Sequence, residues 1–312
     1  MHAPKVSIIT ATLNAAHTLP HTLDSILEQD YAHIEHIIID GKSSDSTLDL
    51  IESYRPKYRA KGYELRVSSD KDNGIYDAMN KGLALASGEI VGFLNADDFF
   101  AKDCVVSLIV WGFAKPSENV QIVYADILYV DEHLAPIRDF TAKPYAKNAF
   151  YFGFHPPHPS FYAKRELYQT YGGFNLKYKI ASDYDLMLRL LERYRLKSLY
   201  IHECFVKMRT GGTSNASLKN ILRANLECFA SFRDNHLARF PLFVALKPLS
   251  KLANVRYARV IKKLIRGGEY RILLVASHEP SHSPLYPTPL RAQAAALSPR
   301  ICEMTEARRH YA

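Results

Sequence analysis

Segments with the character of strands alternate with segments of helical character through the first 126 residues. The strands are expected at 6–11, 34–40, 64–69, 89–95 and 121–126. Helices are expected between them, at 19–29, 48–58 and 75–86. The first run, VSIITA, shows no polar alternation, which is typical of a strand buried on both faces. This strict alternation predicts an α/β fold, in which helices cover both faces of a parallel sheet.

Carboxylates follow three of these strands at the point where each strand ends. Asp40 ends the second strand, Asp70 and Asp72 follow the third, and Asp97 and Asp98 follow the fourth. A single aspartate in such a loop is more often a helix cap than a ligand. Three successive strand ends favour a binding site instead, because ligands of open parallel sheets bind beyond the carboxyl ends of the strands.

The adjacent carboxylates Asp97 and Asp98 stand between an apolar run and two phenylalanines, in the stretch GFLNADDFF. Two desolvated carboxylates repel each other unless a positive partner offsets their charge. Mg²⁺ and Mn²⁺ prefer hard oxygen ligands and often bind through one or two carboxylates plus substrate phosphates. The sequence therefore predicts a divalent cation here, which would neutralise charge developing on a diphosphate leaving group.

Charge and motif content exclude several classes of protein. The net charge is +8, but 243–271 carries eight basic residues against one acid, so the remainder is close to neutral and a nucleic-acid partner is not expected. No G-x-G-x-x-G follows the first strand and no G-x-x-x-x-G-K-[ST] occurs, which argues against dinucleotide and P-loop sites. The four cysteines form no C-x-x-C pair, so neither a zinc site nor a disulfide framework is expected.

The second half of the chain is less regular. An aromatic, His- and Pro-rich stretch at 140–161 breaks the alternation, the segment 168–180 is expected to be loop-like, and 208–215 is expected to be flexible. Helices are expected at 182–193 and 218–235. The segment 240–266 has the pattern of a basic amphipathic helix, which fits an anionic membrane surface or a packing helix with a solvated face.

Localisation follows from what the chain lacks. We find no secretory signal and no run of about 18 apolar residues. We therefore expect a cytoplasmic protein, which the basic segment could attach to the inner face of the plasma membrane.

Five short motifs occur in an order that resembles a known family. They are VSIITATLN (6–14), DGKSSDST (40–47), DNGIYDAMNKG (72–82), FLNADD (93–98) and ASDYDLMLR (181–189). Together they resemble the family 2 glycosyltransferases of GT-A fold, in particular bacterial enzymes that build O-antigen and exopolysaccharide. The resemblance implies a Rossmann-like, mostly parallel sheet in a catalytic domain at 1–217. C-terminal helices at 218–266 and a poorly ordered tail at 267–312 would follow.

The resemblance also implies a nucleotide and donor site. Its residues would be Thr10, Leu13, Asn14, Asp40, Ser43, Asp45, Asp72, Asn80, Lys81, Asn95, Ala96 and Arg209. Asp97 occupies the metal-ligand position of the family's D-x-D motif, and the cation would be Mn²⁺ or Mg²⁺. Asn95 replaces the first acid of that motif, so we expect modest metal affinity.

By the same resemblance, Asp183 would be the catalytic base. It follows Ser182, where the family usually has a glutamate. Asp183 could also serve as a helix N-cap, and the two roles are compatible. Asp185 and His158 are expected on the acceptor side, although a structural role is the default for a buried histidine.

The function implied is inverting transfer of one sugar from a nucleotide sugar, UDP-linked by expectation, to a glycan or a lipid-linked oligosaccharide. The processive motif Q-x-x-R-W is absent, which favours single addition. Two alternatives are a sugar-phosphate nucleotidyltransferase and a non-catalytic nucleotide-sugar-binding protein. The first should carry a Gly-rich loop with Lys or Arg after its first strand, whereas this chain has TATLNAAHT. A non-catalytic nucleotide-sugar-binding protein would need no catalytic base.

Overall fold

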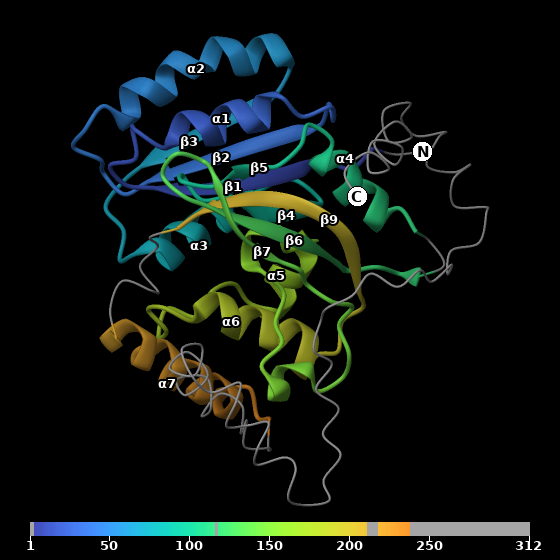
Figure 1. Ribbon diagram of the computed structural model, residues 1–312. Coiled ribbons are helices and arrows are strands. Elements are labelled where there is room, and N and C mark those ends of the chain that lie inside the picture. Colours follow the sequence, from blue (N-terminus) through green and yellow to red (C-terminus); the bar gives the residue numbers. More distant parts are fainter. Residues whose placement is uncertain (1–2, 116–117, 211–217, 238–312) are drawn as a thin grey trace, which may run out of the picture. The chain divides into compact units, whose positions relative to one another are not determined.

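The structure is a computed structural model that describes residues 3–115, 118–210 and 218–237 (Figure 1). The strands are β1 (Val6–Thr12), β2 (Ile34–Asp40), β3 (Glu64–Ser69), β4 (Ile90–Phe93), β5 (Phe99–Phe100), β6 (Ile122–Val130), β7 (Pro136–Phe140), β8 (Tyr162–Lys164) and β9 (Ser198–Arg209). The helices are α1 (Leu19–Leu27), α2 (Thr47–Lys61), α3 (Ile75–Leu85), α4 (Val105–Phe113), α5 (Arg165–Tyr171), α6 (Ser182–Met187) and α7 (Leu218–Asp234). Shorter turns are η2 (Ala149–Phe152), η3 (His158–Ser160) and the π-helical η4 (Leu188–Arg193).

The strands form one mixed sheet in the order β3-β2-β1-β4-β8-β6-β9-β5, with β7 paired to β6. The four strands β3, β2, β1 and β4 are parallel to one another. β8 runs antiparallel to both β4 and β6, and β6 is parallel to β9, so β6 and β9 share the direction of β4. Only β5, β7 and β8 run against the others, and the expectation of a mostly parallel α/β sheet is confirmed.

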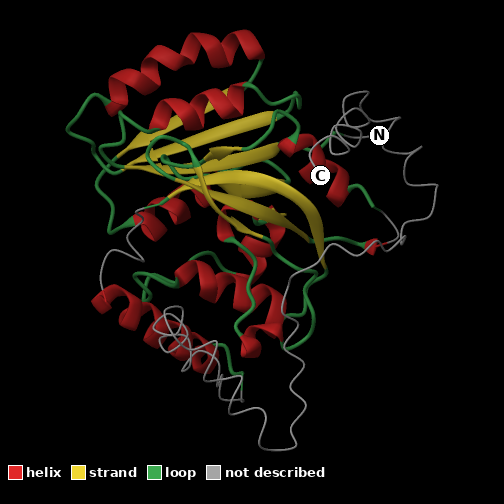
Figure 2. Cartoon of the chain, in the orientation of Figure 1, coloured by secondary structure: helices red, strands yellow, loops and turns green. Residues whose placement is uncertain are grey.

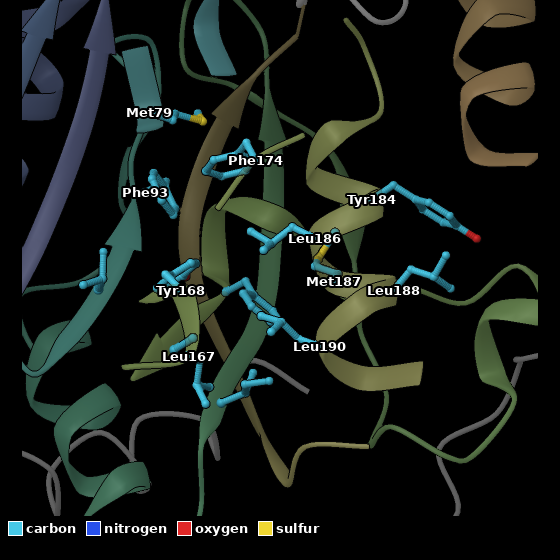
Figure 3. Packing of buried hydrophobic residues seen from close by; sticks show 14 of the residues in the cluster. Met79, Phe93, Leu167, Tyr168, Phe174, Tyr184, Leu186, Met187, Leu188 and Leu190 are labelled. Carbon is cyan, nitrogen blue, oxygen red and sulfur yellow. The ribbon is translucent and has the colours of Figure 1, made fainter. Parts of the chain in front are cut away.

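Helices cover both faces of the sheet (Figure 2). Alternate residues of a strand point to opposite faces, so neighbours in β1 and β2 belong to different cores. Ile8 and Ile38 pack with α1, α2 and α4 on one face. Ile9 and Ile37 pack with α3, α5, α6 and α7 on the other, the cluster shown in Figure 3.

Helix α3 lies unusually close to β1. A Cβ atom at Gly82 would lie 2.4 Å from Cγ2 of Ile9, whose side chain is fully buried and cannot move aside. Only glycine permits this approach. The start of α3, at Ile75 and Tyr76, is thereby set next to the carboxyl ends of the parallel strands.

The expected segments of the first half are confirmed, with β2 and β3 at the predicted bounds and β6 longer than predicted. Two interpretations of the second half are wrong. Residues 168–171 belong to helix α5 rather than to a loop, and the twelve-residue strand β9 was not predicted. β9 pairs with β6 and β5, which lie far from it in sequence. The residues of β9 alone therefore carry only part of the information that makes this segment a strand.

The predicted helix at 182–193 begins as α6 and continues as η4, and that at 218–235 is α7. The basic segment 240–266 and the tail 267–312 lie outside the described residues, so the boundaries at 217 and 266 stay predictions. In the described ranges, no helix is long and apolar enough to cross a membrane.

Candidate active site

The carboxyl ends of β1 to β4 meet at one edge of the sheet. Thr12 pairs with Asp40, which pairs with Ser69 on the next strand, and β4 ends beside β1. The loops that leave these strands therefore lie side by side. Four of the five sequence motifs have residues in these loops.

The loops after β1 and β2 hold each other in place. Asn14 has a positive φ of 50°, and its backbone N–H donates to Ser43 Oγ at 2.8 Å. In return, the Ser44 N–H donates to Asn14 Oδ1 at 2.8 Å. Asp45 accepts the Ala16 N–H at 3.2 Å, and hydrogen bonds from Thr47 lower the pKa of its carboxyl. Asn14, Ser43 and Asp45 thus form one rigid surface.

Asp40 holds the loop after β2 in its conformation. Its carboxylate is fully buried and accepts hydrogen bonds from the backbone of Lys42, from both the backbone and the hydroxyl of Ser43, and from Ser69 Oγ. These bonds satisfy a charge that burial would otherwise make costly. Asp40 therefore shapes the loop that a nucleotide would meet rather than lying on its surface.

Leu13, Gly41 and Asp72 gather where the loops open to solvent. Leu13 is 58% exposed although it is a large apolar residue. A Cβ at Gly41 would lie 2.6 Å from Asp72 Oδ2 and 3.5 Å from Leu13 Cδ1. Lys81 steadies the neighbouring loop by donating to the Lys71 carbonyl at 2.8 Å. An exposed leucine beside a carboxylate suits a flat heterocycle with hydrogen-bond donors.

Two of the expected pocket residues form hydrogen bonds inside the protein. Thr10 is fully buried, and its hydroxyl donates to the Leu94 carbonyl at 2.7 Å and contacts His36 Nε2 at 2.9 Å. Asn80 uses its whole amide on the backbone of Phe174, at 2.9 and 2.8 Å. The Thr10 side chain is therefore bonded inside the protein, whereas half-buried Asn80 holds the Phe174 backbone, and a donor contact of either residue stays a prediction.

The turn at 95–98 resolves the conflict between its two carboxylates. Asp98 is 1% exposed, and burial together with the charge of Asp97 raises the pKa of its carboxyl well above the ordinary value. That shift favours the neutral form. Asn95 Nδ2 and the Arg209 N–H both donate to Asp98, each at 3.3 Å. The pair therefore avoids carrying two adjacent buried charges.

Arg209, at the end of β9, is a positive partner for this turn. Its guanidinium is 9% exposed and donates from Nε to the Asp97 carbonyl at 3.1 Å. Its Nη2 contacts Nδ1 of His21, on α1, at 3.0 Å. Burial raises the pKa of Asp97, and the Arg209 charge opposes that rise.

The oxygen atoms of the turn fit a divalent cation. Ala96 is buried, whereas Asp97 and Asn95 are half-buried. Asn95 Oδ1 is buried and, among the described residues, has no hydrogen-bond partner. No group of three or more His, Cys, Asp or Glu residues suited to a metal occurs in those residues. Asn95 and Asp97 thus resemble sites at which a cation takes its other ligands from substrate phosphates.

Asp183 lies in the first turn of α6, and the N-cap of that helix is Ala181. Asp183 Oδ1 accepts hydrogen bonds from the Tyr76 hydroxyl at 3.1 Å and from the Tyr184 N–H at 2.8 Å. Tyr76 is the second residue of α3, which starts just beyond the carboxyl end of β3. Asp183 therefore lies at the same edge as the loops described above.

The two residues expected on the acceptor side are differently placed. Asp185 is 1% exposed and binds Arg189 at 2.7 Å and Ser231 and Asn235 at 2.9 and 2.8 Å. It joins α6 to α7, and both of its oxygens accept hydrogen bonds within the protein. Its assignment to the acceptor side stays a prediction.

His158 is 9% exposed and stacks on Phe93, with Phe174 against its edge. Burial lowers its pKa, and the Asp183 charge opposes this. Its Nε2 has no hydrogen-bond partner among the described residues. Its assignment to the acceptor side stays a prediction.

Sequence reasoning missed Tyr76 and His21. Tyr76 stands inside the quoted motif DNGIYDAMNKG, so its position was visible, but its partner lies 107 residues away. His21 lies on the exposed side of α1, and nothing in the sequence except its residue type pointed to a functional role.

An edge of loops beyond the carboxyl ends of parallel strands is where a sheet of this kind binds its ligand. The family model "Glycosyl transferase family 2" matches residues 7–171, and the chain belongs to that family. A relative from Mycobacterium tuberculosis, "PGL/p-HBAD biosynthesis glycosyltransferase", is 32% identical over 218 residues. The match spans 69% of this chain and 81% of the relative.

Solved structures of glycosyltransferases share the fold. Residues 1–349 of TarS from S. aureus, in complex with UDP, match with a TM-score of 0.56 at 18% identity, over 73% of this chain and 65% of that TarS fragment. The mannosyltransferase PcManGT from Pyrobaculum calidifontis, in complex with GDP-Man and Mn²⁺, matches with a TM-score of 0.55 at 18% identity. That match spans 86% of this chain and 82% of PcManGT. The likeness confirms the predicted GT-A fold.

Proposed function

We propose that the protein is an inverting glycosyltransferase that moves one sugar from a UDP-linked donor to a glycan or lipid-linked acceptor. The observation that carries this proposal is the position of Asp183. A hydrogen bond from α3 holds it at the sheet edge where the loops of the nucleotide motifs meet. A carboxylate held there can serve as the base that an attacking hydroxyl requires.

The transfer is a single displacement. The acceptor oxygen forms a bond to the anomeric carbon as the bond from that carbon to the diphosphate oxygen breaks. The bonding electron pair leaves with the nucleoside diphosphate, and the hydroxyl proton passes to Asp183. Attack from the side opposite the leaving group inverts the anomeric configuration.

Asn95 and Asp97 would hold a divalent cation, Mn²⁺ or Mg²⁺. When bound, the cation supplies positive charge to the diphosphate. Arg209 fixes the Asp97 backbone and contributes a buried positive charge beside the same turn. Leu13 and Asp72 would contact the heterocycle and the ribose of the nucleotide. These groups would lie on the surface shaped by Asn14, Ser43 and Asp45.

The comparisons support parts of this proposal. TarS binds UDP and PcManGT binds GDP-Man and Mn²⁺, as their titles state, which favours a nucleotide-sugar donor and a cation. The name of the mycobacterial relative favours an acceptor in glycolipid biosynthesis. We retain O-antigen and exopolysaccharide synthesis as related possibilities. We propose that the protein acts in the cytoplasm, at the inner face of the plasma membrane.

A panel of UDP- and GDP-sugars with Mn²⁺ or Mg²⁺ tests the function. We expect one UDP-sugar to raise the melting temperature and to release UDP, slowly with water and faster with a glycolipid acceptor. Binding without turnover would indicate a non-catalytic binding protein. Release of pyrophosphate from a nucleoside triphosphate and a sugar phosphate would indicate a nucleotidyltransferase. Either result would overturn the proposal.

A further inference from the structure

We propose that Tyr76 is a positioning residue for the catalytic base. It holds Oδ1 of Asp183, so that Oδ2 is the oxygen that takes the acceptor's proton. This inference rests on the proposed function, in which Asp183 is that base. Nothing in the sequence motifs distinguishes the two oxygens of Asp183, but the contacts of α3 and α6 do.

Both hydrogen bonds to Asp183 reach the same oxygen. The Tyr76 hydroxyl lies 3.1 Å from Oδ1, and the Tyr184 N–H donates to Oδ1 at 2.8 Å. Within the described residues, no hydrogen bond reaches Oδ2. A carboxylate fixed through one oxygen by two donors cannot rotate freely about its Cβ–Cγ bond. The other oxygen is thereby kept available in one orientation.

Tyr76 is itself held firmly. Its ring stacks on Phe174, with centroids 5.4 Å apart and planes at 24°. Phe174 is fixed in turn by Asn80, which bonds both its N–H and its carbonyl. Asn80 lies one helical turn beyond Tyr76 on α3. The same helix therefore places the phenol and clamps the residue against which its ring packs.

The phenol stays a donor across the pH range in which the enzyme would work. Burial and the Asp183 charge raise the pKa of Tyr76 well above its ordinary value. The Tyr76 oxygen also lies 2.7 Å from the Ile180 carbonyl, so its one hydrogen has two acceptors. An ionised carboxylate attracts that hydrogen more strongly than a neutral one. Tyr76 can therefore donate to Asp183 Oδ1 before the transfer and to the Ile180 carbonyl after Asp183 has taken a proton.

The other titratable groups near this pair are His158 on η3 and Glu227 on α7. Burial lowers the pKa of His158, so its imidazole is neutral near pH 7. Burial raises the pKa of Glu227, but donors from Ile180 and Arg223 hold it below its ordinary value, so it is ionised there. Neither group changes charge near neutral pH. A fall in kcat near neutral pH on loss of the Tyr76 hydroxyl therefore does not come from a change in the charge of either group.

The variant Tyr76→Phe tests the inference, because it keeps the stacked ring and removes only the hydroxyl. A hydrogen bond to a charged group typically has a stabilising effect equivalent to about a 10- to 100-fold change in an equilibrium or rate. We therefore expect kcat for UDP release from the sugar nucleotide identified by the panel to fall by about that factor. The KM for the sugar nucleotide and the affinity for UDP with Mn²⁺ should stay at the wild-type values.

Tyr168→Phe is the matched control. The Tyr168 hydroxyl is buried in the same cluster but has no hydrogen-bond partner among the described residues, so its loss should leave kcat unchanged. Wild-type kcat in Tyr76→Phe would overturn the inference, as would an equal loss in Tyr168→Phe. An active Asp183→Asn variant would instead overturn the proposed base. The two failures are thus distinguishable.

Discussion

Asp97 and Asp98 are neighbours in the sequence, but their surroundings give them different chemistry. Asp98 is almost fully buried and is held by Asn95 and by the Arg209 backbone, and its raised pKa favours the neutral form. Asp97 is half-buried and has a positive charge nearby. At the residue scale, Asp97 is therefore the carboxylate of this pair that remains for a cation.

Asp97→Ala should weaken metal-dependent binding of UDP by at least about tenfold, because even groups that only support a metal ligand change affinity by about 10- to 100-fold. The measurement is calorimetric titration of UDP with Mn²⁺ and again with EDTA. Chelation should weaken UDP binding by wild-type protein and have little further effect on the variant. Wild-type binding that survives EDTA unchanged would contradict the metal role.

Asp183→Asn keeps the shape of the side chain but removes the charge that takes the proton. We expect turnover to fall by about 100- to 10,000-fold, the usual contribution of a general base. The affinity for UDP should be unchanged, as measured by the same titration. Asp49→Asn, on the exposed side of α2, serves as the control and should retain full activity. Comparable activity of the Asp183 variant would refute the assignment.

At the scale of elements, β2 carries three ionisable side chains, Glu35, His36 and Asp40, that are fully buried. Glu35 accepts hydrogen bonds from Ser87 at 2.7 and 2.9 Å and also binds Ser7. His36 lies between Thr10 Oγ1 and the Tyr58 hydroxyl, at 2.9 and 2.7 Å. The strand is buried on both faces, as predicted, because each polar group has partners.

Burial lowers the pKa of His36 to about 3 from an ordinary value of 6.5. Between these values the unfolded chain binds a proton that the folded protein does not, so the free energy of unfolding decreases as pH falls. One such group contributes a slope of at most about 1.4 kcal/mol per pH unit. Denaturant titrations at pH 7, 6, 5 and 4 should show this slope as the difference between wild type and His36→Gln. Parallel pH dependences would exclude His36 as its source.

At the scale of the whole molecule, the described residues form a sheet whose parallel half and strand β6 could be predicted, whereas the other strands could not. β1 to β4 and their helices follow from local patterns, since β1, β2 and β4 are largely apolar and β3 lies between two segments of helical period. β8, three residues long, is defined by its pairing with β4 and β6, which come from distant parts of the chain. Such strands have too little local pattern to be recognised alone.

In the candidate site, too, some features could be predicted from the sequence and others could not. Asp97 and Asp183 were selected by motif, and the structure gives both a geometry that suits the proposed roles. Thr10, Asn80 and Asp185 matched motif positions as well, yet their side chains form hydrogen bonds to other parts of the protein. A motif marks where a residue stands in the chain, whereas exposure depends on what packs against it.

The sequence by itself determined the α/β class, the family and the order of strand ends that carry the site, because hydrophobic period and turn chemistry act over a few neighbouring residues. Tertiary structure decided which atoms meet. The contacts of Arg209 with Asp98, of Phe174 with Asn80 and of Tyr76 with Asp183 span 111, 94 and 107 residues. Contacts of that span form only when whole elements pack, and packing sets the burial and charge that distinguish a ligand, a base and a structural carboxylate.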